Sequence, residues 1–174
     1  MIYYACSYVP LEILMASKQP FKRIKTPTKT ESELIHRNLC DYCKTAFQTV
    51  MNLEKDDVFI SVDSCDAMRR ISDVLKKQAK AKVITLRLPW KNNKQAVKMY
   101  KKELEHLIKE LSDYYKINSF DKELSSVMKR YNEIRENIWN VHKDDHSAFE
   151  KQKTIDNAFN GEFYKPETNQ QPED

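Results

Sequence analysis

Glycine is almost absent from this sequence of 174 residues: Gly161, near the C-terminus, is the only one. Loops that cradle the phosphates of a nucleotide, such as the P-loop and the dinucleotide fingerprint, need several glycines between a strand and a helix. No such stretch exists here. A nucleotide site of either kind is therefore excluded, and any nucleotide that the chain binds would need a different kind of site.

Long apolar runs and an excess of one charge are also missing. No stretch of about eighteen apolar residues could span a membrane, and the apolar N-terminus, which contains Pro10 and Glu12, lacks the basic start of a signal peptide. The net charge is only +4 although 32% of the residues are charged. This charge is too small and too dispersed to indicate a nucleic-acid partner. We expect neither a membrane nor a nucleic acid among the partners.

Cysteine is present four times, in a chain without an export signal. Such cysteines indicate a reducing compartment, so we predict a cytoplasmic protein with free or metal-bound thiols and no disulfides. The length of the chain suits one domain with a sizeable core.

The most informative stretch runs from Val58 to Arg70. Val58 to Val62 is apolar and β-branched, which is typical of a strand buried on both faces. Asp63-Ser64-Cys65-Asp66 then leads into a segment with helical spacing of its apolar residues. The turn of such a unit is where α/β folds place their ligands, and the N–H groups of a helix start stabilise a thiolate there. Cys65 lies in this turn.

The same pattern occurs at the N-terminus. Residues 2–8 are predicted to form a strand with Cys6 near its end, and Pro10 suits the first turn of the following helix. A third strand is expected at 82–88 and a short one at 21–24. Each of the three long strands precedes a helix that is long enough for a right-handed crossover, so these strands should be parallel.

Helical spacing of apolar residues also predicts a helix over 33–53, which would place Cys40 and Cys43 on one face, and two long helices over 94–116 and 120–139. The predicted fold is therefore α/β, a Rossmann-like three-layer domain with a mainly parallel sheet and two long C-terminal helices. We assign this domain to residues 1–139. Residues 140–174 are expected to form an irregular, partly disordered tail.

The cysteines can be interpreted in two ways. A single cysteine in a cytoplasmic protein is more often a small buried hydrophobic residue than a ligand, and Cys43, on the apolar stripe of its helix, fits that interpretation best. Cys6 and Cys65, however, follow strands whose ends meet at one edge of a parallel sheet. Several thiolates there would suit an iron–sulfur cluster or zinc. Cys40-x-x-Cys43 has no second CxxC pair with which to complete a zinc site. Its predicted place inside a helix also disfavours a thioredoxin-like redox site.

An ordered series of short motifs resembles the 2-hydroxyacyl-CoA dehydratase family, the D-component group that also contains benzoyl-CoA reductase subunits. The resemblance covers about residues 2–138. The motifs that carry it are Cys6-Ser7-Tyr8-Val9-Pro10-Leu11-Glu12-Ile13, Leu39-Cys40-Asp41-Tyr42, Asp63-Ser64-Cys65-Asp66 with Arg69 and Arg70, Leu86-Arg87-Leu88-Pro89, Tyr100 with Glu103 and Leu104, and Tyr131-Asn132-Glu133-Ile134-Arg135.

This resemblance implies an oxygen-sensitive iron–sulfur (4Fe-4S) cluster held by cysteines between Rossmann-like domains. In such proteins an ATP-hydrolysing activator delivers one electron, and a 2-hydroxyacyl-CoA loses water by way of a ketyl radical. Cys6 and Cys40 match family ligands best. Cys65 matches a frequent family cysteine, whereas Cys43 matches none.

The resemblance also implies a partner, because it extends over the first half of such subunits only. We expect a second dehydratase subunit or a chain with the missing domain, together with the activator and an acyl-CoA substrate. Alone, the chain should be inactive. The alternative is a non-catalytic assembly module, or remnant, that keeps the fold and binds a larger subunit without a cluster.

Overall fold

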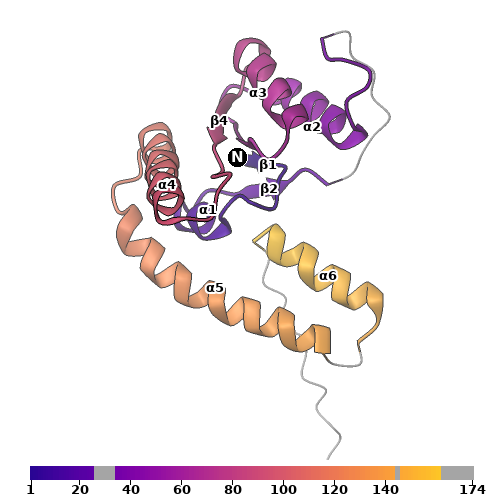
Figure 1. Cartoon of the computed structure of the whole chain (residues 1–174). Helices are drawn as coiled ribbons and strands as arrows, with labels where there is room; N and C mark the ends of the chain where they lie inside the picture. The colour runs from indigo at the N-terminus through magenta and orange to yellow at the C-terminus, as the bar shows by residue number, and fades with distance from the viewer. Residues whose placement is uncertain (26–33, 144–145, 162–174) are drawn as a thin grey trace, which may run out of the picture.

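The structure, a computed structural model of the whole chain, describes residues 1–25, 34–143 and 146–161. Its centre is a four-stranded sheet in the order β2-β1-β3-β4 (Figure 1). The elements in chain order are β1 Ile2–Tyr4, α1 Leu11–Ala16, β2 Phe21–Arg23, α2 Asp41–Met51, β3 Val58–Val62, α3 Asp66–Gln78, β4 Lys82–Leu86, α4 Lys94–Tyr115, α5 Phe120–Lys143 and α6 Ala148–Phe159.

All three strand pairings are parallel, which confirms the predicted α/β fold. Ile2 of β1 pairs with Phe21 of β2 on one side and with Val58 of β3 on the other, and Val58 in turn pairs with Lys82 of β4. The carboxyl ends of the four strands therefore lie at the same edge of the sheet. The first and third predicted strands are shorter than expected, since β1 ends at Tyr4 and β4 at Leu86.

The sheet separates two cores, which gives the three layers that were predicted. On one face, Ile2, Tyr4 and Ile60 pack with residues of α1, α4 and α5. On the other face, Phe59 packs against α2 and α3 (Figure 1). β3 is buried along its whole length, in agreement with its continuous apolar sequence.

Helix α2 begins later than predicted. The expected start at residue 33 lies outside the described residues, and the chain forms turns over 34–40 before α2 begins at Asp41. The His36 ring and carbonyl accept the N–H groups of Asn38 and Leu39, at 3.2 and 3.1 Å. Cys40 is therefore not inside the helix but is its N-cap residue.

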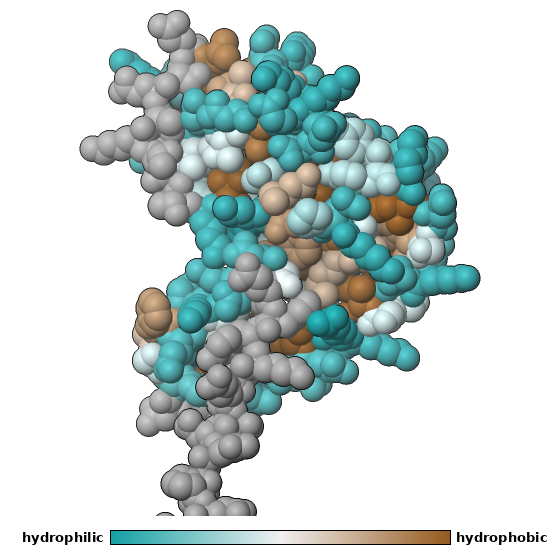
Figure 2. All heavy atoms as spheres, turned by 180° about the vertical axis from the view of Figure 1, so that it is seen from behind, coloured by the Kyte–Doolittle hydropathy of each residue, from teal (hydrophilic) through white to brown (hydrophobic). Residues whose placement is uncertain are grey.

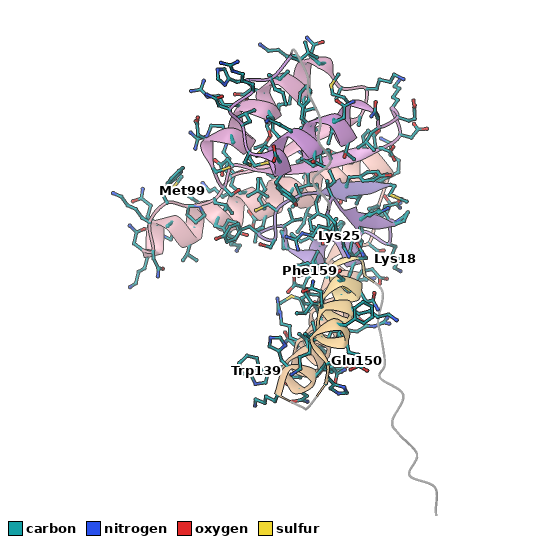
Figure 3. The ribbon with its side chains drawn as sticks, turned by 90° about the vertical axis from the view of Figure 1, so that its right-hand side faces the viewer. Lys18, Lys25, Met99, Trp139, Glu150 and Phe159 are labelled. Carbon is teal, nitrogen blue, oxygen red and sulfur yellow. The ribbon has the colours of Figure 1, made fainter. Side chains whose placement is uncertain are left out.

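The segment after residue 139 is also more regular than predicted. α5 continues to Lys143, and α6 begins with a capping box in which Ser147 and Glu150 exchange hydrogen bonds. α6 then returns to the edge strand β2, where the Arg23 guanidinium lies over the Phe159 ring and Lys25 pairs with Asp156 at 3.1 Å (Figure 3). Residues 162–174 lie outside the described residues.

Gly161 ends this last turn. Its φ is +74°, and a Cβ at this position would be 2.6 Å from Cζ of Phe21. The only glycine of the chain thus occupies a position that combines a left-handed backbone with a close contact to β2.

The surface in Figure 2 is mostly hydrophilic, with hydrophobic residues gathered in the middle and on the right-hand part of that face. In the described part of the chain, no helix has both the length and the apolar character that crossing a membrane requires.

Candidate functional site

The first candidate ligand, Cys6, lies in the turn between β1 and α1. Buried Ala5 continues β1, and the turn is closed by a hydrogen bond from the N–H of Val9 to the carbonyl of Cys6 at 3.2 Å. Pro10 directly precedes α1 and is its N-cap residue. The partly buried Cys6 thiol donates to the hydroxyl oxygen of Ser64 at 3.5 Å. This contact joins the β1 turn to the β3 turn.

The β3 turn carries Cys65, which is exposed and caps the N-terminus of α3. Its sulfur accepts the N–H of Met68 at 3.4 Å. Asp63, at the start of the turn, is bonded to the segment that ends β4: its N–H donates to the carbonyl of Leu86 at 3.1 Å, and its Oδ1 accepts the N–H of Leu88 at 2.7 Å. The turn is thus held to the sheet, and Cys65 remains an exposed residue on it.

Cys40 occupies the corresponding position on α2. It is exposed, is the N-cap residue, and makes no capping hydrogen bond with its side chain. The helix start is positioned by Tyr42, whose hydroxyl lies 2.6 Å from the carbonyl oxygen of Ala5 and 2.9 Å from that of Ile24. α2 is therefore fixed to the ends of β1 and β2, beside the Cys6 turn.

Cys43 lies one turn into α2 and is 2% exposed, within the core between α2, α3 and the sheet. Burial raises the pKa of the Cys43 thiol far above its usual range, and the neighbouring thiols of Cys40 and Cys65 raise it further. Cys40 and Cys65 are therefore both neighbours of the buried Cys43. Sequence reasoning correctly expected a buried Cys43 but missed this neighbourhood, because it depends on how α2 packs against α3.

We call the carboxyl end of the sheet with its four thiols, Cys6, Cys40, Cys43 and Cys65, the cysteine edge. Thiols suit iron–sulfur ligation, so the donor chemistry fits such a cluster. Within the described residues, no group of three or more His, Cys, Asp or Glu side chains is arranged to hold a single metal ion. In an iron–sulfur cluster, different cysteines bind different iron atoms. The thiols must therefore surround a cluster-sized space and do not have to converge on the position of a single ion.

A cavity of about 500 Å³ opens beside the Cys6 turn. Its lining comes from the 7–10 turn, from helices α1, α4 and α5 and from Phe159 of α6, and it is mainly apolar. The Arg135 side chain forms part of the cavity wall. Its guanidinium pairs with the Glu12 carboxylate and lies 4.6 Å from the centre of the Tyr131 ring. Sequence reasoning did not predict the cavity, although Tyr131 and Arg135 belong to the motifs singled out there.

Two exposed aromatic side chains flank the cysteine edge. Tyr8 of the Cys6 turn is 61% exposed and Trp90, after β4, is 79% exposed. The Arg69 guanidinium of α3 lies 5.6 Å from the centre of the Trp90 ring. This edge therefore combines thiols, exposed aromatic rings and a cation that lies against one of the rings.

Comparison with known proteins identifies the family of this chain. A search of curated proteins gives no match. A protein-family model described as 2-hydroxyglutaryl-CoA dehydratase, D-component, matches residues 6–154, a range that begins at Cys6, contains all four cysteines and ends within α6. The chain therefore belongs to the 2-hydroxyglutaryl-CoA dehydratase D-component family.

Proposed function

We propose that this chain supplies Cys6, Cys40 and Cys65 as ligands to a 4Fe-4S cluster in a 2-hydroxyacyl-CoA dehydratase, where it acts with a second subunit or chain. The observation that carries the proposal is the cysteine edge: thiols from three separate segments lie at the end of the sheet where α/β folds place their ligands. Bound there, the cluster would supply the one-electron chemistry that removal of water from the substrate requires.

The protein's own residues would position the ligand cysteines and shield the substrate from water. Asp63 and Tyr42 hold the turns with Cys65 and Cys40 to the sheet by hydrogen bonds to backbone groups. Cys43 is buried beneath them and is therefore not assigned as a ligand. The apolar cavity beside the Cys6 turn would exclude water from an acyl group.

Iron binding tests the ligand assignment. The full chain, reconstituted anaerobically with iron and sulfide, should become brown and bind iron and sulfide in the ratio of a 4Fe-4S cluster. Cys6→Ser, Cys40→Ser and Cys65→Ser should each bind far less, because each removes one thiolate. Cys43→Ala is the matched control and should bind as the unmodified chain does. Equal iron content in all four variants would contradict the assignment.

Activity tests the role of the partner. The reconstituted chain alone should not dehydrate a 2-hydroxyacyl-CoA when it is supplied with an ATP-hydrolysing activator, ATP and a reductant, because the cysteine edge is open to solvent. Activity should appear when a chain with the second dehydratase domain is added. Turnover by the single chain would refute this requirement. A chain that binds such a partner tightly but takes up no iron would instead support the assembly module.

A further inference from the structure

Cys40-Asp41-Tyr42-Cys43 has the arrangement of a redox-active dithiol. Cys40 is the N-cap of α2 and is exposed, whereas Cys43 is the third residue of the helix and is buried. A CxxC pair within a helix would not be expected to exchange disulfides, but a pair that begins at the N-cap has one accessible sulfur for attack and one protected sulfur behind it. Because α2 begins only at Asp41, the argument against a redox site, which assumed that both cysteines lie inside a helix, no longer applies.

We propose that Cys40 and Cys43 form a reversible disulfide, so that the cysteine edge is a thiol–disulfide couple in addition to a ligand site. The oxidant is a small disulfide such as oxidised glutathione. The Cys40 thiolate attacks one of its sulfurs, which breaks the S–S bond and releases one glutathione as a thiol. The Cys43 thiol then attacks the Cys40 sulfur and passes its proton to the departing glutathione, which is released as a second thiol. Two electrons pass from the two cysteines to the reagent.

The geometry favours Cys43 over the other thiols as the partner of Cys40. Cys40 and Cys43 belong to one short segment, the N-cap and the first turn of α2, so a disulfide between them requires only a local adjustment where the helix begins. A bond from Cys43 to Cys65 would instead join two separate helices, α2 and α3.

The Cys40–Cys43 disulfide would also control cluster binding, a consequence that rests on the proposed function. A Cys40 sulfur in a disulfide cannot bind iron, so oxidation should block cluster assembly until a reductant restores the thiol. The cysteine edge would then bind a cluster only in its reduced state. This dependence goes beyond ligation itself, because it links the occupancy of the site to the thiol–disulfide balance around it.

Peptide mapping of the full chain tests the disulfide without any iron present. After incubation with oxidised glutathione and rapid blocking of free thiols, trypsin should release residues 38–44, 56–69 and 1–18 as separate peptides, which carry Cys40 with Cys43, Cys65, and Cys6. We expect peptide 38–44 to be lighter by two hydrogens than its reduced form, and dithiothreitol to reverse the change. A lasting glutathione adduct on Cys40, a crosslink between 38–44 and 56–69, or unchanged thiols would each overturn the proposal.

Two variants separate the roles of the sulfurs. Cys43→Ala should trap glutathione on Cys40, since no second thiol can displace it. Cys40→Ser, a change at an exposed site, should leave Cys43 unmodified because that thiol is buried; equal modification of Cys43 in this variant would refute the assigned order of attack. Iron uptake after oxidation is measured separately. A chain that forms the disulfide but never binds iron would support the couple and refute the cluster.

Discussion

Asp63→Ala should loosen the turn that carries Cys65. Asp63 is partly buried, and its carboxylate accepts the N–H of Leu88 at 2.7 Å. A hydrogen bond to a charged group contributes about 1.5–3 kcal/mol, and loss of this acceptor leaves the Leu88 N–H without a protein partner. Because solvent reaches the site in part, we expect the variant to lose about 1–2 kcal/mol of the free energy of unfolding.

Urea unfolding measures this loss. With a slope of about 2 kcal/mol per molar urea, the midpoint should fall by roughly 0.5–1 M while the slope stays unchanged. Asp63→Asn keeps an oxygen acceptor without the charge, so it should cost less than half as much. The Cys6 thiol, which donates to Ser64 of the same turn, should react faster with iodoacetamide in Asp63→Ala.

Asp66→Ala is the matched control. Asp66 lies three residues further along the chain, and its side chain is 72% exposed, with only a long contact of 3.5 Å to Arg70. An exposed carboxylate in the first turn of a helix contributes about 0.5 kcal/mol. Equal losses for Asp63→Ala and Asp66→Ala, or an unchanged Cys6 reactivity, would refute the idea that the Asp63–Leu88 bond holds the turn.

Three further predictions concern the core, the last helix and the alkaline limit of stability. Tyr42→Phe removes the hydroxyl that reaches the carbonyls of Ala5 and Ile24, so it should cost about 1–2 kcal/mol in urea unfolding, against no loss for Tyr8→Phe at an exposed site. Gly161→Ala should cost about 1–3 kcal/mol and release α6 to proteases, because its φ is positive and Phe21 leaves no room; unchanged proteolysis would contradict this. Burial raises the pKa of Cys43, and also of Tyr4 and of Tyr115, the last to about 12. The folded chain therefore keeps protons that the unfolded chain releases, and stability should be complete below pH about 8.5 and fall as the pH rises toward 12, which pH-dependent urea midpoints would show.

The α/β architecture could be predicted because its signals are local. β3 is an unbroken apolar run that is buried along its whole length, and the segments after β3 and β4 repeat their apolar residues with helical spacing. The start of α2 could not be predicted in the same way. Ile35 and Leu39 continue the helical spacing of α2 and do pack against its core, but they do so from turns. Burial, and not helix formation, explains their apolar character.

The final helix was missed for a different reason. Its apolar stripe is weak, yet Ser147 and Glu150 form the capping box that marks a helix start, and that S-x-x-E spacing is visible in the sequence. The neighbourhood of Cys43 and Cys65 and the cavity beside Cys6 carry no local signal, since they arise where separate helices meet. Sequence reasoning therefore found the thiols of the turns, Cys6 and Cys65, and missed the residues that surround them.

At the cysteine edge, the residues that hold the turns in place differ from the residues that would bind iron or exchange disulfides. Asp63 and Tyr42 bond to backbone atoms at the ends of the strands, whereas Cys40 and Cys65 are exposed residues, of which Cys40 makes no capping bond and Cys65 accepts only the long one from Met68 at 3.4 Å. Substitution of either exposed cysteine should then change iron binding or disulfide exchange with little effect on unfolding, while substitution of Asp63 should alter stability and thiol reactivity together. The proposed bond between Cys40 and Cys43 would adjust only the first turn of α2, and the hydrogen bonds of the Tyr42 hydroxyl to the ends of β1 and β2 would favour return of that turn after reduction.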